Sequence, residues 1–332
     1  MGSSAAIAPG AKDGSGPARR LTVSVIVCTK DREEELQTLV RSLLGQLRLP
    51  DELVIIDGGA PTDLESRLTA DIEARVPLVY VRTAPGLPRQ RNRGIAASHG
   101  DVLLFLDDDV VLDEDYVAEL AEFLENDAAE SFAAVQGAVV DCPRRRAGRS
   151  IETRGWRHSV GRAIEDAFML WSTGNGKIKR SGFPARAHGD QPSDLEFMSG
   201  CSMCMRRGVF DEVGFDEKLT GYAFMEDVDI CRQLLRRGYG AAYWPRARLE
   251  HHYTTSSRTP SARLGRMMIH NHHYLHCKHS EGSLPERSAF WWSSIGLVVY
   301  AAGKGDWRMA RGVLDGLRDV LRHDNPLLRE GP

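Results

Sequence analysis

Short apolar segments alternate with helical patterns through the first third of the chain, and this alternation restricts the possible folds more than any other feature. Four segments are rich in β-branched or apolar residues, as buried strands are: Thr22–Cys28, Leu53–Ile56, Leu78–Val81 and Val102–Leu106. Leucines and valines recur at helical spacing from residue 36 to 47, with Asp31 and Glu34 as a capping box, and weaker helical patterns cover 63–75 and 88–98. This order predicts an α/β fold with a doubly wound, mostly parallel sheet that binds ligands at the carboxyl ends of its strands.

The rest of the chain has a less regular pattern. Residues 141–186 lose the periodicity and carry eleven basic against four acidic side chains, a net charge of +7, so we expect a long basic loop. A second structured block runs from 197 to about 252, with a helix near 225–237 followed by a strand pair. The C-terminal end is predicted to be helical, because apolar residues form a stripe: Trp307, Val313, Leu314, Leu317, Val320 and Leu321.

Composition excludes several classes of protein. The 332 residues are 42% hydrophobic and carry 43 basic and 46 acidic side chains, for a formal net charge of −3. Such a balance is typical of a globular protein with a sizeable core and argues against a dedicated nucleic-acid binder, which needs a basic surface. Six cysteines at irregular spacing indicate free or buried thiols and a reducing compartment.

Neither a secretory signal nor a membrane-spanning segment is evident. Residues 1–20 are rich in Gly, Ala, Ser and Pro and are predicted to be a disordered tail. The longest apolar run, Phe290–Ala302, is interrupted by Ser293 and Ser294 and is shorter than the roughly 20 residues that span a bilayer. Two interpretations of this run stay open: a helix packed on the main domain, or a helix lying on a membrane surface.

Three carboxylates, Asp107, Asp108 and Asp109, directly follow the fourth predicted strand. Adjacent like charges are costly unless a cation neutralises them, and hard oxygen ligands suit Mg²⁺ or Mn²⁺. The alternative is an acidic loop that caps the next helix, but Asp113 and Asp115 are better placed to do this. The motif therefore indicates a metal site at the ligand-binding edge of the sheet.

Three other segments carry residues suited to catalysis or binding. Glu226 and Asp227 open a predicted helix, where the helix dipole favours carboxylates and where one of them could serve as a general base. His251 ends a predicted strand and could supply a nitrogen ligand to the metal, the alternative being a surface histidine. Arg91, in the run Leu87–Gly94 that contains three arginines, could contact phosphate.

Three further groups of residues have competing interpretations. The basic region 141–186 could contact an anionic acceptor or membrane, or be a solvated loop. The histidines from 270 to 279 have a spacing that could hold zinc, but the usual cysteine pairs of a structural zinc site are missing. Cys201 and Cys204 form a single C-x-x-C motif, for which packed or free thiols are the better interpretation.

Taken in order, the motifs resemble those of family 2 glycosyltransferases, which have the GT-A fold. The matching segments extend over about residues 21–255 and are VSVIVCTKDREEEL, ELVIIDGG, LPRQRNRGIAASHGDVLLFLDDDVVLDEDYV, GVFDEVGFDEKLTGYAFMEDVDICRQLLRRGYG and PRARLEHH. Their number and order make the resemblance far more specific than any single motif. One departure is that Gly58 and Gly59 stand where the family often has Asp-Asn or Asn-Gly.

The resemblance implies a role for each matching residue. It assigns the nucleotide-sugar pocket to Thr29, Asp31, Asp57, Arg91, Asp107 and Asp108. It assigns the metal, Mn²⁺ or Mg²⁺, to Asp107, Asp109 and His251. It makes Asp227 the catalytic base, with Glu226 beside it.

The resemblance also implies the reaction. An inverting, nucleotide-sugar-dependent enzyme would move a sugar from a nucleotide-diphosphate sugar to a hydroxyl of a sugar, a lipid-linked sugar or another acceptor, in the synthesis of cell-surface polysaccharide or glycoconjugate. We expect a cytoplasmic protein without nucleic-acid partners, with peripheral contact to the inner face of the membrane as an open alternative. The expected organisation is a tail (1–20), a nucleotide-sugar-binding half (21–140), an acceptor-binding and catalytic half (141–260) and a helical extension (261–332).

Two other functions compete with transfer of a sugar. The segment DDDVVL also matches the motif of haloacid-dehalogenase-like phosphohydrolases, in which Asp107 would be the nucleophile, but that motif follows a first strand and here three strands precede it. A catalytically inactive sugar-binding module is the other alternative. Retention of both the Asp triplet and the Glu226-Asp227 pair argues against it.

Overall fold

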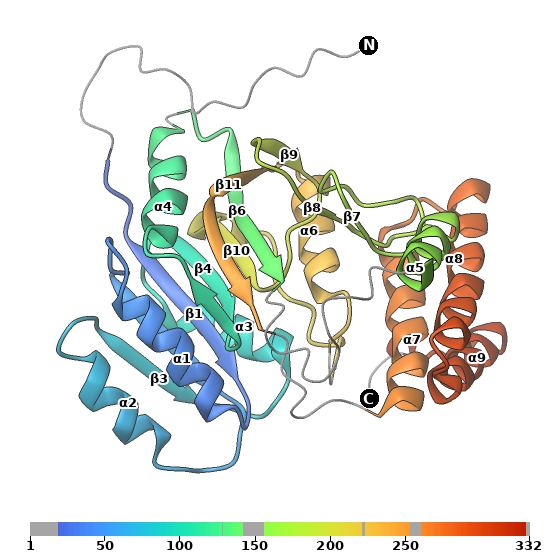
Figure 1. Cartoon of the computed structure of the whole chain (residues 1–332), viewed down its shortest axis with the longest axis horizontal. Helices are drawn as coiled ribbons and strands as arrows, with labels where there is room; N and C mark the ends of the chain where they lie inside the picture. The colour runs from blue at the N-terminus through green and yellow to red at the C-terminus, as the bar shows by residue number, and fades with distance from the viewer. Residues whose placement is uncertain (1–18, 128, 142–155, 221–222, 253–259, 330–332) are drawn as a thin grey trace.

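Four parallel strands form one half of the central sheet in the order β3-β2-β1-β4 (Figure 1). Their bounds are β1 (Val23–Thr29), β2 (Glu52–Asp57), β3 (Leu78–Arg82) and β4 (Val102–Asp107). The chain is seen in a computed structural model, which describes residues 19–127, 129–141, 156–220, 223–252 and 260–329. All four strands predicted from the sequence are confirmed, and the parallel pairing brings Thr29, Asp57 and Asp107 to the same edge of the sheet. The predicted tail lies, apart from residues 19 and 20, outside the described residues.

The helices between these strands are also where the periodicity predicts them. They are α1 (Glu33–Leu44), α2 (Leu64–Ile72) and α3 (Leu87–Ala97). The predicted capping box is wrong, because the N-cap of α1 is Arg32 and no side chain caps the helix. Asp31 instead has a positive φ of 55°, and its carboxylate accepts a hydrogen bond from the Ala60 amide at 3.0 Å.

The second half of the sheet contains both parallel and antiparallel strand pairs, and the sequence pattern predicts few of its strands. It contains β5 (Val110–Leu112), β6 (Phe132–Asp141), β9 (Ser193–Leu195), β10 (Ser202–Arg206) and β11 (Gly240–His251). The full order is β3-β2-β1-β4-β10-β6-β11-β5, and β9 pairs with β11. Strand β10 is antiparallel to both β4 and β6, so it joins the two halves into one sheet.

The structure corrects two predictions in this half. The predicted strand pair is one long strand, β11, whose pairing with β6 shifts register between Trp244 and Arg248. The region 141–186 is not one loop: it contains α5 (Trp156–Ala167), and β7 (Ser172–Gly174) pairs in parallel with β8 (Ala185–Ala187). Its most basic stretch, 142–155, lies outside the described residues.

Helices cover both faces of the sheet. On one face, α1, α2 and α4 (Tyr116–Asn126) pack their leucines against β1, β2 and β4. On the other, the core includes residues of α6 (Glu226–Arg236) and of the C-terminal helices α7 (Ser261–His279), α8 (Leu284–Gly303) and α9 (Trp307–Leu321). Successive side chains of β1 point to opposite faces of the sheet. Ile26 packs into the core that includes α6 to α9, whereas Val25 and Val27 pack into the core that includes α1, α2 and α4.

The C-terminal helices group at one end of the molecule, away from α2 and β3 (Figure 1). Two 3₁₀ turns complete the described elements, at Arg207–Asp211 and Pro326–Leu328. The predicted α9 stripe is only partly buried, because Val313 and Val320 are in the core whereas Trp307 and Leu321 are 70% and 65% exposed. In the described part of the chain, no helix is both long enough and apolar enough to cross a membrane.

Candidate active site

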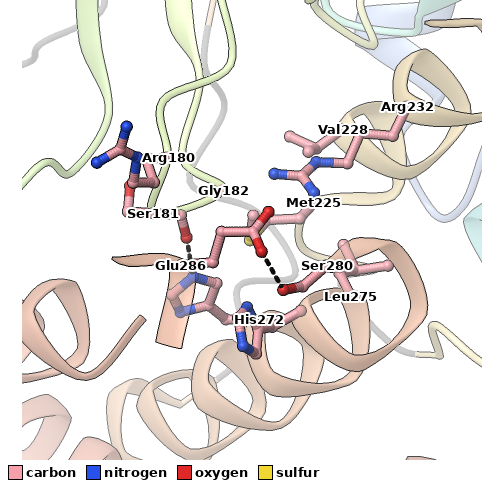
Figure 2. A pocket seen from close by; sticks show the side chains of 11 residues that line it. Arg180, Ser181, Gly182, Met225, Val228, Arg232, His272, Leu275, Ser280 and Glu286 are labelled. Carbon is pink, nitrogen blue, oxygen red and sulfur yellow. Dashed lines mark hydrogen bonds between the residues drawn. The ribbon is translucent and has the colours of Figure 1, made fainter. Parts of the chain in front are cut away.

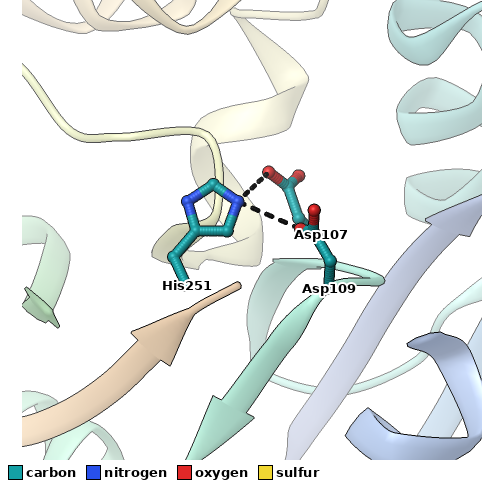
Figure 3. Close-up of side chains that lie close together, drawn as sticks. All are labelled: Asp107, Asp109 and His251. Carbon is teal, nitrogen blue, oxygen red and sulfur yellow. Dashed lines mark hydrogen bonds and ion pairs between the residues drawn. The ribbon is translucent and has the colours of Figure 1, made fainter. Parts of the chain in front are cut away.

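Asp107, Asp109 and His251 come together where β4 ends and β11 ends. Asp107 closes β4, Asp109 directly precedes β5, and His251 is the last residue of β11, which pairs with β5. One ligand atom from each lies within 4.8 Å of the others. Figure 3 shows the His251 imidazole facing both carboxylates, with Nε2 3.0 Å from Asp109 Oδ1 and 4.0 Å from Asp107 Oδ2.

Cationic side chains surround this acidic cluster. Arg32 donates to the buried Asp108 carboxylate at 2.9 Å and lies 3.7 Å from Asp109. Burial raises the pKa of Asp108 to about 7, although Arg32 opposes the shift. Burial disfavours the charged form of His251, but the hydrogen bonds to Asp109 and Cys201 and the charge of Asp107 outweigh it and raise the pKa of His251 to about 12.

The donor set fits a divalent metal. Two carboxylates and one imidazole nitrogen suit Mn²⁺ or Mg²⁺, which bind mainly oxygen ligands. With three protein ligands, the other coordination positions of such an ion would be available to water or phosphate. Among the described residues, no other group of three or more His, Cys, Asp or Glu has a comparable geometry. These are the three residues for which the sequence predicts a metal-binding role.

The end of β2 forms the adjoining part of the site. The buried Asp57 carboxylate accepts hydrogen bonds from the Tyr80 hydroxyl at 2.7 Å, from Arg82 at 3.2 Å and from the Gly59 amide at 2.7 Å. A Cβ at Gly59 would lie 2.8 Å from an Asp31 oxygen and 3.0 Å from an Asp57 oxygen. Gly59 thus lies between two carboxylates, where a side chain would be crowded.

Thr29 links the strand ends to the acidic cluster. Its buried hydroxyl donates to Asp108 at 2.8 Å. The Gln90 amide donates to the carbonyls of Thr29 and Ile56, at 2.9 Å each, and so ties α3 to the ends of β1 and β2. The residues predicted for the nucleotide pocket thus form one connected edge of the sheet.

Arg91 connects this edge to the second half of the molecule. Its side chain is only 2% exposed, and it donates to Glu226 at 2.6 Å, to the Gly200 carbonyl at 2.8 Å and to Asp107 at 3.4 Å. The guanidinium also lies over the Phe215 ring, 5.2 Å from its centroid. Arg91 therefore connects the Asp triplet to the Glu226-Asp227 pair through buried contacts. Its guanidinium is not an exposed charge on the surface of the site.

Glu226 and Asp227 occupy different environments although they are neighbours in the first turn of α6. Glu226 is buried against Arg91, and burial raises its pKa to about 8 although Arg91 opposes the shift. Asp227 is partly exposed and accepts from two backbone amides, that of Val228 at 2.9 Å and that of Gly200 at 3.4 Å. Burial also raises the pKa of Asp227, an effect opposed by the charges of Arg91 and Arg186.

Sequence reasoning missed several side chains of this site. Arg32, Tyr80, Arg82 and Gly200 contact predicted residues, and Arg186 of β8 is close enough to Asp227 to act on its charge. Arg32 could have been found, because it follows β1 directly in the segment TKDR. The contact of Gly200 with Arg91 joins positions 109 residues apart, and no local pattern indicates it.

Two pockets adjoin the catalytic half. A cavity of about 20 Å³ lies between α6, α7 and the start of α8, where His272 bonds to the Ser181 carbonyl and Ser280 donates to Glu286 (Figure 2). That volume holds about one water molecule, so it is not a substrate site. The second pocket, of about 850 Å³, is lined by polar residues of the β7–β8 region, among them Asn175, Lys177, Lys179 and His188.

The other candidate groups are explained by packing. His272 and His279 are held by the Ser181 carbonyl and by Asp229, each at 2.6 Å, and the histidine-rich segment forms no metal cluster among the described residues. Cys201 and Cys204 are buried free thiols, as the sequence predicts.

A sequence model of glycosyl transferase family 2 matches residues 24–214, more than half of the chain. The glucosyl-dolichyl phosphate glucuronosyltransferase of Haloferax volcanii is 25% identical over 241 residues, which are 70% of this chain and 69% of that protein. Two further curated relatives are matched over only 29% and 31% of their own lengths.

Solved structures of glycosyltransferases share the fold. GalNAc-T7, determined with UDP, GalNAc and Mn²⁺, superposes with a TM-score of 0.61 at 15% identity over 94% of this chain and 59% of that chain. The mannosyltransferase PcManGT of Pyrobaculum calidifontis, in complex with GDP-Man and Mn²⁺, gives a TM-score of 0.54 at 15% identity over 91% of this chain and 88% of that chain. The phosphohydrolase alternative is not favoured, because the Asp triplet follows the fourth strand of this fold.

Proposed function

Because the chain belongs to glycosyl transferase family 2 and is a glycosyltransferase, we propose that it transfers a sugar from a nucleotide-diphosphate sugar to an acceptor hydroxyl with inversion at the anomeric carbon. The observation that carries this proposal is the cluster of Asp107, Asp109 and His251, connected through Arg91 to the first turn of α6. The donor would lie along the ends of β1, β2 and β4, in the half of the chain from 21 to 140. The half from 141 to 260 would bind the acceptor.

Asp227 is the catalytic base in this proposal. It takes the proton of the acceptor hydroxyl while that oxygen attacks the anomeric carbon, and the bond from that carbon to the donor diphosphate breaks. Support comes from its partial exposure and from the backbone amides that orient it. The buried Glu226 is a positioning residue, because its carboxylate is committed to Arg91.

Asp107, Asp109 and His251 would hold the divalent cation, and Mn²⁺ is the ion present in both structural relatives. When bound, such a cation neutralises the donor diphosphate and the charge of the leaving nucleoside diphosphate. Thr29 and Arg32 keep Asp108 in place beside it. Asp31 and Asp57 form the wall of the pocket where the nucleoside would bind.

For the acceptor, we propose a lipid-linked sugar bound in the pocket of the β7–β8 region. The pocket offers Lys177, Lys179 and His188, which suit phosphate and sugar hydroxyls, and β8 carries Arg186, whose charge acts on Asp227. The glucuronosyltransferase of H. volcanii acts, by its name, on a glucosyl-dolichyl phosphate.

Thermal shift and donor hydrolysis together test the proposal. UDP-, GDP- and dTDP-sugars with Mn²⁺ are added to the full chain, and we expect one nucleotide class to raise the melting temperature, because a ligand that binds only the native state stabilises it. That donor should be hydrolysed slowly in the presence of Mn²⁺. In Asp109→Ala the hydrolysis rate should fall by about 100-fold or more, as for the loss of an electrostatic stabiliser in a catalytic site.

Asp113→Ala is the matched control. Asp113 lies four residues after Asp109 in the chain. Its side chain is 54% exposed, and it is not part of the metal cluster. Its variant should keep both the thermal shift and the hydrolysis rate. Donor hydrolysis that survives in Asp109→Ala, or a melting temperature that no nucleotide sugar changes, would contradict the proposed site.

A further inference from the structure

Helix α8 has one buried face and one exposed apolar face. Phe290 and Leu297 are buried in the core. On the opposite side Trp291, Ile295 and Val299 are 37%, 49% and 38% exposed. Trp292 is 46% exposed, and it stacks on Phe168 with ring centroids 4.7 Å apart and donates to the Ala167 carbonyl. The spacing from 291 to 295 and 299 is one helical turn each, so these side chains share a face. No charged residue interrupts that face between Ser288 and Gly303.

Helix α9 also exposes apolar residues, in a mixed pattern. Trp307, Leu314 and Leu321 are 70%, 42% and 65% exposed and lie seven residues apart, on one side of the helix. Arg311 and Arg318 lie between them on the same side, with exposed side chains. A short connection, residues 304–306, joins α8 to α9, and the two helices pack together.

The exposed apolar residues of the molecule are concentrated here. Nine of the twelve large hydrophobic residues exposed in the described chain are in the C-terminal helices or next to them: Leu284, Trp291, Trp292, Ile295, Val299, Trp307, Leu314, Leu321 and Leu328. Figure 1 shows α8 and α9 at the end of the molecule away from α2 and β3. Such a concentration is unusual for a monomer surface and marks an interaction site.

The charges beside this surface are basic. Arg308, Arg311, Arg318 and Arg322 all have exposed positions on α9 or at its end. The acidic residues nearby have other partners: Asp306 caps α9, and Asp319 faces Arg266 and His270 of α7. The remaining carboxylates on or beside α9 pair with arginines, Asp315 with Arg318 at 2.6 Å and Arg311 at 3.9 Å, and Asp324 with Arg329.

We propose that the exposed apolar residues of α8 and α9, together with the arginines of α9, form a docking face that lies in the surface of an anionic lipid bilayer. Tryptophan prefers the membrane–water interface, and leucines between arginines are typical of helices that lie in it. Basic side chains near the bilayer add attraction to anionic headgroups. Since no described helix can cross a membrane, the contact would be peripheral.

Charge argues for a bilayer rather than a second copy of this chain. In a two-fold symmetric pair the same patch of each copy meets the other, so the interface would bring together the four arginines of both α9 helices, eight positive charges against few acidic side chains. An anionic bilayer meets them with the opposite charge. The same physical reason predicts that added salt weakens the contact.

Vesicle co-sedimentation of the full chain tests this inference. The vesicles are pure phosphatidylcholine or phosphatidylcholine with about 30% phosphatidylglycerol, and we expect binding to the anionic vesicles to be at least about tenfold tighter. The triple variant Trp307→Ser, Leu314→Gln, Leu321→Gln should bind them at least about tenfold more weakly. The double variant Arg311→Glu, Arg322→Glu should lose the preference for anionic lipid.

Matched controls come from the other end of the molecule. Leu47→Gln changes a leucine that is 73% exposed, and Arg75→Glu changes an exposed arginine after α2. Both should bind vesicles as the wild type does, and circular dichroism and melting temperature verify that every variant is folded. The substituted side chains of α9 are exposed, so we expect all variants to fold.

Two results would overturn the inference. One is a wild-type chain that does not sediment with anionic vesicles, or a triple variant that sediments equally well. The other is a concentration-dependent dimer in analytical ultracentrifugation that the triple variant abolishes, which would assign the face to a second copy. Vesicle binding needs neither donor nor acceptor, so its failure is separate from failure of the proposed transferase reaction.

Discussion

Arg91 contacts both acidic groups of the candidate site. A buried guanidinium is tolerated only when its donors are satisfied, and here Glu226, Asp107 and the Gly200 carbonyl accept from it. The resemblance assigns Arg91 to the nucleotide, whereas its contacts make it a bridge within the protein. The reason is that α3 carries it inward, below the ends of β1 and β4.

Glu226 and Asp227 should respond differently to removal of their charge. Above pH 8, where the Glu226 carboxylate is charged, Glu226→Gln leaves Arg91 buried without its closest counterion, and we expect the free energy of unfolding to fall by about 3–5 kcal/mol, as for other broken buried pairs. Asp227→Asn keeps the shape of a partly exposed side chain. It should leave the melting temperature within about 2 °C of the wild type and lower the transfer rate by about 100-fold or more.

Urea unfolding and transfer kinetics, measured on both variants, test this difference. The proposed division of roles would be contradicted if Asp227→Asn were the strongly destabilised variant, or if it kept the wild-type kcat. Donor binding, measured by thermal shift, should be retained in Asp227→Asn, because the base contacts only the acceptor.

His272 should make stability depend on pH. Burial, together with the charges of His276, Arg232 and His273, lowers its pKa to about 3, although the bond to the Ser181 carbonyl opposes the shift. Above pH 6.5 the imidazole is neutral both folded and unfolded. As the pH falls below 6.5, the unfolded chain takes up a proton that the folded chain does not, so stability is lost at about 1.4 kcal/mol per pH unit from this group.

His272→Gln isolates this contribution. A glutamine amide can still donate to the Ser181 carbonyl, so the variant should mainly lose the titration. Between pH 6.5 and 4, we expect the free energy of unfolding of the variant to fall less steeply than that of the wild type. The difference between their unfolding free energies at pH 8 gives the part of the effect of the substitution that does not depend on pH. Parallel curves for the two proteins over this range would show that His272 does not resist protonation.

Among the elements, the pair α7 and α9 depends on small residues where the helices cross. A Cβ at Gly312 would overlap the backbone carbonyl of Ala262 in the first turn of α7, and one at Gly316 would come within 3.0 Å of the Arg266 carbonyl. Backbone atoms cannot move aside as a flexible side chain can. The close approach of the two helices therefore requires glycine at these positions.

Gly312→Ala should destabilise the chain by about 1–3 kcal/mol, the usual cost of overpacking, despite the better helix propensity of alanine. Gly161→Ala in α5 is the control, because a Cβ there meets nothing within 4 Å. It should be neutral or slightly stabilising in the same urea titration. Equal stability of the two variants would mean that α9 can move away from α7 at no cost.

Elements were predictable where local pattern and tertiary environment agree. The strands β1, β2 and β4 are buried on both faces, so each is a nearly continuous apolar run that can be recognised by itself, and the partly exposed edge strand β3 is recognised by its β-branched and aromatic residues. The sequence pattern is less clear in the other long strands. β6 contains Gln136, β10 consists mainly of methionine and cysteine, and β11 carries arginines where its register shifts. Their pairing, rather than their composition, makes them strands.

At the scale of the whole molecule, one sheet joins the two halves that the sequence separates by function. β10, from the half 141–260, lies between β4 and β6, which come from the half 21–140, and is antiparallel to both. The halves thus share backbone hydrogen bonds as well as the contacts of Arg91. Neither half has a sheet of its own that could persist after the other unfolds.

We therefore expect a single unfolding transition for the sheet in differential scanning calorimetry. A calorimetric enthalpy equal to the van't Hoff enthalpy would support cooperative unfolding of residues 21–260. Two separated transitions, of which nucleotide sugar with Mn²⁺ moves only one, would instead mean that the donor-binding half folds independently.

Sequence alone determined the α/β class, the first four strands and the chemistry-bearing residues, because periodic burial and adjacent carboxylates are local properties of a chain. The tertiary structure decided which of those residues meet. His251 lies 142 residues from Asp109 and Glu226 lies 135 from Arg91, and each pair forms only because β11 reaches β5 and α6 packs beside α3. Likewise, a stripe of apolar residues predicts a helix but not its partner, so only the packed helices reveal that Trp307 and Leu321 face solvent.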